Sequence, residues 1–287
     1  MSNISTLSHR SQEPESGVLY LVGTPIGNMN DISSRALNIL KNVSFIGCED
    51  TRQTKKIMAK YEFKNKVISF NKHNASYKIA KIIQDLKEGK SVAIVSDAGM
   101  PSICDPGEDL VKNAKINGVE IICIPGPCAA LTALLTSGMP ASSFIFEGFL
   151  PKKKAEREKI LFEISTNKKT TILFESPNRL YKLLSELNKY CGEDREIHIS
   201  RELTKKFEEN ISLRVNEAID FFKEKEVLGE ITIVIKGISN TKDSRFNESH
   251  LRKELHELVD AGLSLSAASR YLAKKENITK SKIYNLY

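Results

Sequence analysis

The chain has 287 residues, of which 40% are hydrophobic and 28% are charged, enough to bury the cores of two domains and a small appendage. No apolar run approaches the roughly 18 residues that a membrane-spanning helix needs, which excludes an integral helical membrane protein. The formal net charge of +7 is compatible with a polyanionic partner without identifying one.

The first 16 residues are polar and contain no apolar signal-peptide core. We therefore expect residues 1–16 to form a disordered leader. An N-terminal α/β domain is expected over residues 17–140, where short apolar segments alternate with helical patterns. The strand-like segments are 18–22, 43–48, 67–70, 91–95 and 121–124, and the helical patterns lie near 33–40, 51–61, 76–89 and 108–117. This alternation predicts a mostly parallel sheet with helices on both faces.

Three loops rich in Gly and Pro follow apolar strands in this half of the chain, at residues 23–28, 96–107 and 125–130. The second is roughly twice as long as the two to six residues of an ordinary turn, although a surface turn is the alternative interpretation. Loops of this kind at the carboxyl ends of neighbouring strands predict one ligand pocket. None carries a G-x-G-x-x-G or G-x-x-x-x-G-K-[ST] pattern, which favours a nucleoside-like ligand without a pyrophosphate.

A second α/β domain is expected over residues 141–238. Residues 142–151 are extended and are interpreted as the bridge into it. Helices are predicted at 154–165, 178–190 and 215–223, and strands at 170–174, 196–199 and 230–235. The polar residues 239–244 are predicted to be a linker.

The last segment, residues 245–287, has a helical pattern with an apolar face and a Gly-containing break. A second helix over 265–275 and a third ending at Tyr287 give the spacing of a helix-turn-helix. From position 270 onward the sequence has five basic residues and one acidic residue, Glu276. The basic residues are Arg270, Lys274, Lys275, Lys280 and Lys282. This excess favours nucleic acid over the alternative, an amphipathic dimerisation or packing tail.

The five cysteines are scattered and include no C-x-x-C pair; they are Cys48, Cys104, Cys123, Cys128 and Cys191. This usage argues against a disulfide framework or a structural zinc site and predicts a reducing, cytoplasmic location.

Seven motifs occur together in order: residues 23–28 (GTPIGN), 48–52 (CEDTR), 96–107 (SDAG with DPG), 125–127 (PGP), 148–151 (GFLP), 174–177 (FESP) and 201–205 (RELTK). With them the chain closely resembles the ribosomal RNA small subunit methyltransferase I family, a branch of the tetrapyrrole methylase superfamily. The resemblance covers roughly residues 17–238, and the helical tail also looks like the family's C-terminal helix-turn-helix.

The resemblance implies S-adenosylmethionine-dependent 2′-O-methylation of a cytidine in the decoding region of 16S ribosomal RNA, within the small ribosomal subunit. It also implies a fold of two α/β domains with the cofactor in the cleft between them, a homodimer, and no metal. Two rival interpretations stay open: a tetrapyrrole C-methyltransferase, or a non-catalytic ribosome-assembly RNA-binding protein with a vestigial cofactor fold. The basic tail disfavours the first, and intact Asp97, Gly99, Pro125 and Gly126 disfavour the second.

Matching the family's motifs places the cofactor contacts at Pro25, Ile26, Asp97, Ala98, Gly99, Met100, Pro101, Cys128 and Ala129. Asp97 is the strongest candidate, because a carboxylate accepts hydrogen bonds and offsets the charge of a cationic cofactor. Its alternative role is to cap the following turn. Two positions depart from the expected pattern: Met100 stands where Thr is expected, and Cys128 where Ser is common.

Methylation of a ribose hydroxyl calls for a proton acceptor. The carboxylate candidates are Glu49, Asp50, Glu175 and Glu202, although Asp50 is also a candidate helix N-cap and Glu202 a candidate ion-pair partner of Lys205 or Lys206. The expected RNA contacts are Arg52, Arg179, Arg201 and Lys205, together with Arg270, Lys274, Lys275 and Lys280 in the tail. Residues 152–154 and Arg157 are a possible extension of this basic track, or simply a solvated helix start.

Overall fold

The computed structural model describes residues 13–71, 74–105, 107–238, 248–275 and 279–287. Its contacts divide the chain into two compact units, Met1–Gly237 and Ile238–Tyr287, and each is described by itself. Of the predicted leader, residues 1–12 lie outside the described part. The carboxylate of Glu13 pairs with the guanidinium of Arg35 at 2.6 Å, so residue 13 is held against the first helix.

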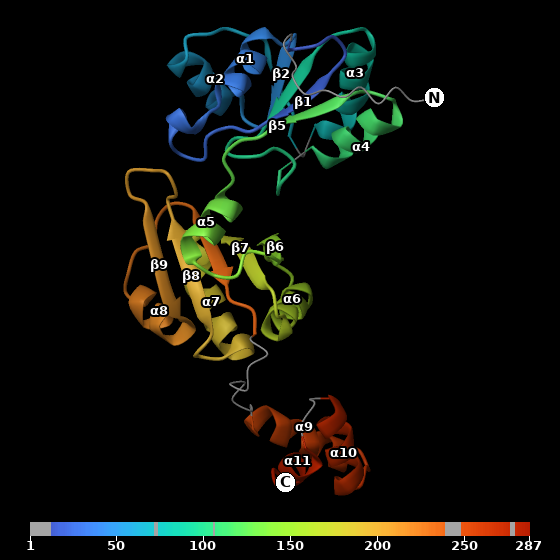
Figure 1. Ribbon diagram of the computed structural model, residues 1–287, viewed down its shortest axis with the longest axis vertical. Coiled ribbons are helices and arrows are strands. Elements are labelled where there is room, and N and C mark those ends of the chain that lie inside the picture. The colour runs from blue at the N-terminus through green and yellow to red at the C-terminus, as the bar shows by residue number, and fades with distance from the viewer. Residues whose placement is uncertain (1–12, 72–73, 106, 239–247, 276–278) are drawn as a thin grey trace. The chain divides into compact units, whose positions relative to one another are not determined.

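The first unit begins with a five-stranded sheet in which all neighbouring strands are parallel, as the alternation of elements predicted (Figure 1). Its strands are β1 (Leu19–Val22), β2 (Phe45–Cys48), β3 (Val67–Ser69), β4 (Val92–Val95) and β5 (Ile121–Ile124), in the order β3-β2-β4-β1-β5. Strands β2 and β4 are completely buried and β1 is nearly so, since helices cover both faces of the sheet, whereas β3 and half of β5 are partly exposed. The carboxyl ends of β4, β1 and β5 are therefore neighbours, and these are the strands that the three Gly/Pro-rich loops follow.

Helices α1 (Ser34–Asn42) and α2 (Thr51–Lys60) cover one face of this sheet through Ile39, Leu40 and Ile57. Helices α3 (Ala75–Lys87) and α4 (Glu108–Ile116) cover the other face. A short 3-10 helix, η1 (Met29–Asp31), follows the first loop. Each helix begins close to its predicted position.

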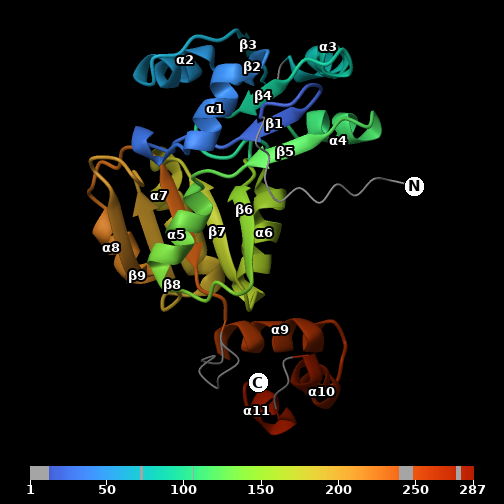
Figure 2. The same cartoon turned by 45° about the horizontal axis from the view of Figure 1, so that its top comes forward.

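A second five-stranded sheet follows in the same unit. Its strands are β6 (Phe144–Phe149), β7 (Thr170–Glu175), β8 (Glu196–Arg201), β9 (Glu209–Arg214) and β10 (Ile231–Ile235), in the order β6-β7-β10-β8-β9. Only β6 and β7 run parallel; the other pairs are antiparallel. Helices α6 (Lys154–Thr166), α7 (Pro177–Cys191) and α8 (Val215–Phe222) pack on one face, and α5 (Ala129–Ser137) packs on the other (Figure 2).

Three details of this half differ from the sequence-based expectation. The segment interpreted as a bridge, residues 142–151, contains β6, an edge strand of the second sheet. Strand β9 was not predicted, because in Glu209–Arg214 only Ile211 and Leu213 are apolar and both are half-buried. Helix α5 follows β5 in the chain but packs on β7, β8 and β10, so it contributes to the core of the second sheet.

The second unit is a three-helix bundle of α9 (Glu248–Asp260), α10 (Leu265–Lys275) and α11 (Lys280–Tyr284). Its core includes Leu255, Leu272 and Ile283, all fully buried, and Leu255 belongs to the apolar face that the periodicity of the first tail helix predicted. The predicted linker 239–244 and Glu276 lie outside the described residues. Within the described ranges, no helix has both the length and the apolar character needed to cross a membrane.

Candidate active site

The loops that follow β1 and β4 are joined by backbone hydrogen bonds. The Thr24 N–H donates to the Gly99 carbonyl at 2.9 Å, and the Gly99 N–H donates back to the Thr24 carbonyl at 3.1 Å. The loop after β5 lies equally close, because a Cβ on Gly126 would stand 2.8 Å from Gly23 Cα. Only glycine at both positions permits this approach. The three loops thus form one continuous surface, as their shared character predicted.

This surface forms part of a pocket of about 440 Å³, a volume typical of small-molecule sites. From the first sheet's loops and the start of α5 the lining residues are Ile26, Glu49, Asp97, Ala98, Gly99, Met100, Ile103, Cys104, Asp105, Cys128 and Ala129. From the second sheet they are Phe149, Phe174, Glu175, Ser176, Pro177, Leu203, Gly229, Glu230, Ile231 and Thr232. Of the predicted cofactor contacts, all but the buried Pro25 and Pro101 are in the lining.

The pocket is acidic and apolar. Five of its lining residues carry carboxylates, namely Glu49, Asp97, Asp105, Glu175 and Glu230. Among the described lining residues there is no Lys, Arg or His. Aliphatic and aromatic side chains supply most of the remaining wall. Such a lining suits a ligand that combines a positive charge with apolar surface.

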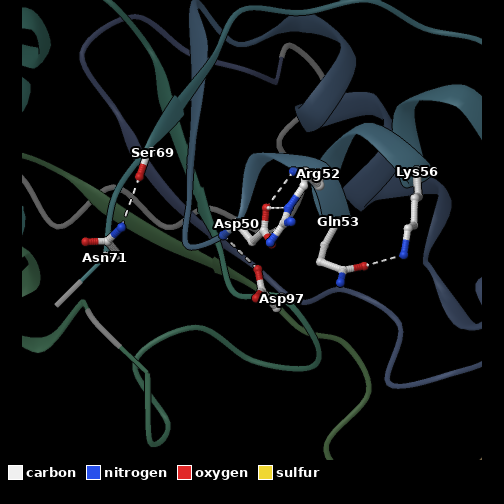
Figure 3. A network of polar contacts seen from close by, with 7 residues as sticks. All are labelled: Asp50, Arg52, Gln53, Lys56, Ser69, Asn71 and Asp97. Carbon is white, nitrogen blue, oxygen red and sulfur yellow. Dashed lines mark hydrogen bonds and ion pairs between the residues drawn. The ribbon is translucent and has the colours of Figure 1, made fainter. Parts of the chain in front are cut away.

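Asp97 and Asp50 connect the loops after β4 and β2 (Figure 3). The Asp50 N–H donates to Asp97 Oδ1 at 2.9 Å. The Asp50 carboxylate caps α2 by accepting the Arg52 N–H at 2.8 Å and also receives the Arg52 guanidinium. These hydrogen bonds from Arg52 lower the pKa of the Asp50 carboxyl to about 2. Asp50 is thus the helix N-cap that the sequence offered as its alternative role, and its carboxylate is outside the pocket lining.

Glu175, at the end of β7, lines the pocket, is only 2% exposed and belongs to a cluster of charged side chains. Its Oε1 lies 2.6 Å from Arg179 Nη2, and its Oε2 lies 3.6 Å from Arg157 Nη2. Arg157 in turn pairs with Glu186 at 2.7 Å. Arg157 is only 5% exposed, so its predicted place in an RNA-binding track is wrong: its guanidinium is used inside the fold.

Glu202 belongs to a strained loop that links the two sheets. Its Oε1 accepts a hydrogen bond from Lys205 Nζ at 2.6 Å, as its alternative role predicted. Burial opposes its ionisation, but hydrogen bonds from Lys205 and from the Glu230 backbone outweigh this and lower the pKa of Glu202. Nearby Thr204 has a φ of +65°, which is rare for a β-branched residue, and its Oγ1 accepts the Asn28 N–H at 2.9 Å.

None of the expected RNA contacts is among the described residues that line the pocket. Arg52 is exposed but paired with Asp50; Arg179, Arg201 and Lys205 are paired with Glu175, Glu209 and Glu202, respectively. In the second unit Arg270 and Lys274 are exposed on α10. Lys275 pairs with Glu254, and Lys280 donates to Ser266 Oγ at 2.7 Å.

Two site features were missed from the sequence. Phe149 is an exposed aromatic residue of the lining, and its only signal was its place in the GFLP motif. Thr204 is the link between the sheets described above, and no local pattern indicates a contact with a residue 176 positions away.

The comparisons with known proteins agree with this architecture. Residues 18–219 match the family model of the tetrapyrrole (corrin/porphyrin) methylases. Among solved structures, a cobalt precorrin-4 methyltransferase of cobalamin biosynthesis aligns with a TM-score of 0.59 at 19% identity, over 77% of this chain and 95% of that one. The uroporphyrin-III C-methyltransferase of Thermus thermophilus aligns with a TM-score of 0.53 at 18% identity, over 76% and 94%. At these identities the two structures support the fold alone.

Curated relatives are much more similar in sequence. The protein named ribosomal RNA small subunit methyltransferase I in Thermotoga maritima is 47% identical to this chain, over 77% of this chain and 99% of the relative. The protein of that name in Bacillus subtilis is 40% identical over 94% of both chains, and that of Synechocystis is 38% identical over 94% and 97%. The chain is therefore a methyltransferase of the tetrapyrrole methylase family and belongs to its ribosomal RNA small subunit methyltransferase I branch.

Proposed function

We propose that the chain transfers a methyl group from S-adenosylmethionine to the ribose 2′-hydroxyl of a cytidine in the decoding region of 16S ribosomal RNA. The observation that carries the proposal is the acidic, partly apolar pocket formed by the loops after β1, β4 and β5 and by the second sheet. It occurs in a chain whose curated relatives are named as methyltransferases of small-subunit ribosomal RNA.

The pocket fits the cofactor chemically. S-adenosylmethionine, when bound, supplies a methyl group on a positively charged sulfur. The carboxylate of Asp97 would offset that charge, and Ile26 and Ala129 would give apolar contact to the nucleoside. The close approach of Gly23 and Gly126 keeps the loops that carry these residues together. We assign the other lining residues among the predicted contacts, Gly99 and its neighbours included, to the same site.

The proton of the ribose hydroxyl needs an acceptor at the pocket wall. Of the four carboxylate candidates, Asp50 caps α2, Glu175 pairs with two arginines, and Glu202 pairs with Lys205. Glu49 stands at the end of β2, half-buried, in the pocket lining. Glu49 precedes Asp50, whose N–H donates to Asp97, so it lies in the wall beside the loop that carries the proposed cofactor contact. This position makes Glu49 our proposed acceptor, and kcat of a Glu49→Gln variant tests it.

The RNA phosphates would bind outside the pocket, because its carboxylates repel them. Arg52 follows the lining residue Glu49 by three positions, and Arg201 pairs with the lining residue Ile231 across β8 and β10. The exposed Arg270 and Lys274 of α10 offer a second basic surface. Only the target nucleotide would enter the pocket. We propose that these groups hold the backbone of the RNA while the ribose is presented to the cofactor.

We infer further that the substrate is 16S ribosomal RNA within the small ribosomal subunit, and that the enzyme acts in the cytoplasm as a homodimer. The five cysteines are all free thiols, which supports a reducing compartment. On α5 the side chains of Leu131 and Leu135 are 46% and 76% exposed. Burial of these two leucines against a second copy of the chain would support the homodimer, and sedimentation of a Leu135→Asp variant tests it.

The rival function, C-methylation of a tetrapyrrole, is favoured by the fold alone. The macrocyclic substrates of such enzymes are acidic, and the described lining of this pocket has no Lys, Arg or His that could bind an acidic substrate. Of its five carboxylates, Glu175 and Glu230 are paired with basic residues outside the lining. The electrostatic character of the pocket therefore favours RNA, whose target nucleotide contributes a neutral ribose and base.

The test is transfer of labelled methyl groups to small ribosomal subunits and to naked 16S RNA, with the product mapped by nuclease digestion and mass spectrometry. A ribose-methylated cytidine in the decoding region is the expected product. Transfer to the subunit but not to naked RNA would identify the assembled particle as the substrate. Cofactor binding without transfer to either would favour the tetrapyrrole function.

A further inference from the structure

An irregularity in β6 determines where Phe149 points. Phe146 pairs with Ile172 of β7, Gly148 pairs with Leu173, and Phe149 pairs with Phe174. Between the first two pairs β6 therefore advances two residues while β7 advances one, which is a β-bulge. Since strand side chains alternate between faces, the extra residue returns Phe149 to the face of Phe146.

Without the bulge Phe149 would point to the opposite face, where Leu150 and Leu173 are buried among the helices of the second sheet. Instead its ring lies 5.7 Å from that of Phe174, which in turn lies 5.0 Å from that of Phe146. The three rings form a row that ends in the pocket wall. Phe149 is 52% exposed although it is a large apolar side chain, so the bulge turns it away from the available core.

The neighbouring glycine allows this arrangement. Gly148 has a φ of +62°, and a Cβ there would lie 2.6 Å from Cys104 Sγ. The loop from the first sheet that carries Cys104 thus passes directly over the bulge. Phe149 and Cys104 both line the pocket as a result. Bulges beside active sites commonly re-aim a side chain in this way.

We propose that the exposed ring of Phe149 is the surface on which the base of the substrate nucleotide stacks. The inference rests on the proposed function, for which a nucleotide must be drawn out of the RNA into the pocket. Single-stranded bases bind proteins mainly by stacking on aromatic rings. The residues matched to the cofactor all come from loops of the first sheet and the start of α5, whereas Phe149 comes from the second sheet, on the part of the wall left for the second reactant.

The test compares Phe149→Ala, Phe149→Leu and Phe149→Trp in the full chain. Cofactor affinity is measured by calorimetry, and KM and kcat for small ribosomal subunits by labelled methyl transfer. Loss of one stacked base is worth about 1–3 kcal/mol, or roughly 5- to 150-fold. We expect Phe149→Ala to raise KM for RNA within that range, Phe149→Leu to raise it less, and Phe149→Trp to preserve it. Cofactor affinity should stay within about twofold in all three, since a twofold change is only about 0.4 kcal/mol.

The matched control is Phe162→Ala, which removes a ring that is 58% exposed on α6 outside the pocket lining. It should leave KM unchanged. An increase in the cofactor Kd of Phe149→Ala, with KM for RNA unchanged, would assign the ring to the cofactor's adenine and overturn the proposal. Unchanged KM and Kd in Phe149→Ala would do the same. If the wild-type protein bound cofactor but methylated no RNA, the proposed function itself would fail, and the variants would not be needed to show it.

Discussion

The backbone N–H of Asp50 donates to Asp97 Oδ1 across 2.9 Å (Figure 3). The loop after β2 therefore positions Asp97, the strongest candidate for binding the cofactor. One oxygen of Asp97 serves the fold in this way, and the carboxylate as a whole lines the pocket. A substitution that keeps this oxygen but removes the charge therefore separates the structural role of Asp97 from its electrostatic role.

The Asp97→Asn variant should retain the link to Asp50 and lose the negative charge that we propose to face the cofactor. A hydrogen bond to a charged group is worth about 1.5–3 kcal/mol, which corresponds to roughly 10- to 150-fold in the dissociation constant. Calorimetry with S-adenosylmethionine measures this loss, and thermal unfolding of the variant should match the wild type. Unchanged cofactor affinity would remove Asp97 from the cofactor site.

Glu175 is expected to act in stability rather than in proton transfer. Replacing it with Ala would leave Arg157 without one of its two carboxylate partners in the interior and would unpair Arg179. Breaking a buried ion pair costs about 3–5 kcal/mol. Denaturant unfolding of Glu175→Ala should show a loss of this size. A variant with wild-type stability and a lost kcat would instead make Glu175 the proton acceptor.

The first sheet and the three loops followed from the sequence because parallel strands buried on both faces are continuous apolar runs. Strands β1 and β4 show this, since nearly all of their residues are buried. Strand β9 was not predicted because it is a half-exposed edge strand with only two apolar residues, Ile211 and Leu213. Helix α5 is apolar enough to be predicted, but its sequence does not say which sheet it covers.

At the site, motif matching found the pocket loops but could not rank the carboxylates. Asp50, Glu175 and Glu202 are all acids at strand ends, and only their partners in the structure distinguish their roles. Asp50 caps a helix, Glu175 belongs to a buried ion pair, and Glu202 pairs with a lysine of its own loop. Phe149 was missed for another reason. Its direction depends on one extra residue in β6, and strand periodicity read from the sequence places it on the wrong face.

The hydrogen bond from the Asn28 N–H to Thr204 Oγ1 should hold the first loop against the second sheet. The contact is tight, because a Cβ on Gly27 would lie 2.8 Å from the same oxygen. Thr204→Val keeps the shape of the side chain and removes the acceptor, so we expect a loss of about 0.5–1.5 kcal/mol in the free energy of unfolding. Thr204→Ser should restore it. Equal stabilities of the Val and Ser variants would contradict this role.

His198 predicts a pH dependence of stability. The side chain is 2% exposed on β8, and its burial lowers its pKa, although a hydrogen bond with Asn210 opposes the shift. The unfolded chain therefore binds a proton more readily than the folded chain. Above the ordinary pKa of 6.5, His198 is neutral in both states and does not lower the free energy of unfolding. As the pH falls from 6.5 towards the lower pKa of the folded chain, the free energy of unfolding declines. Denaturant unfolding at several pH values should show this decline in the wild type and a weaker one in His198→Gln.

Two neighbouring lysines of α10 should contribute unequally to RNA binding. Lys274 is exposed, whereas Lys275 is already paired with Glu254 of α9. A phosphate contact by Lys274 would release about 0.7–0.9 counterion, so Lys274→Ala should reduce the slope of log K against log salt by that amount. Lys275→Ala is the matched control, one residue away and identical in charge, and should change the slope less, because its ammonium must leave Glu254 to reach a phosphate. Filter binding of small ribosomal subunits over a salt series measures both slopes. Equal slopes for the two variants would mean that the pair with Glu254 does not restrict Lys275, and an unchanged slope for Lys274→Ala would remove α10 from the RNA interface.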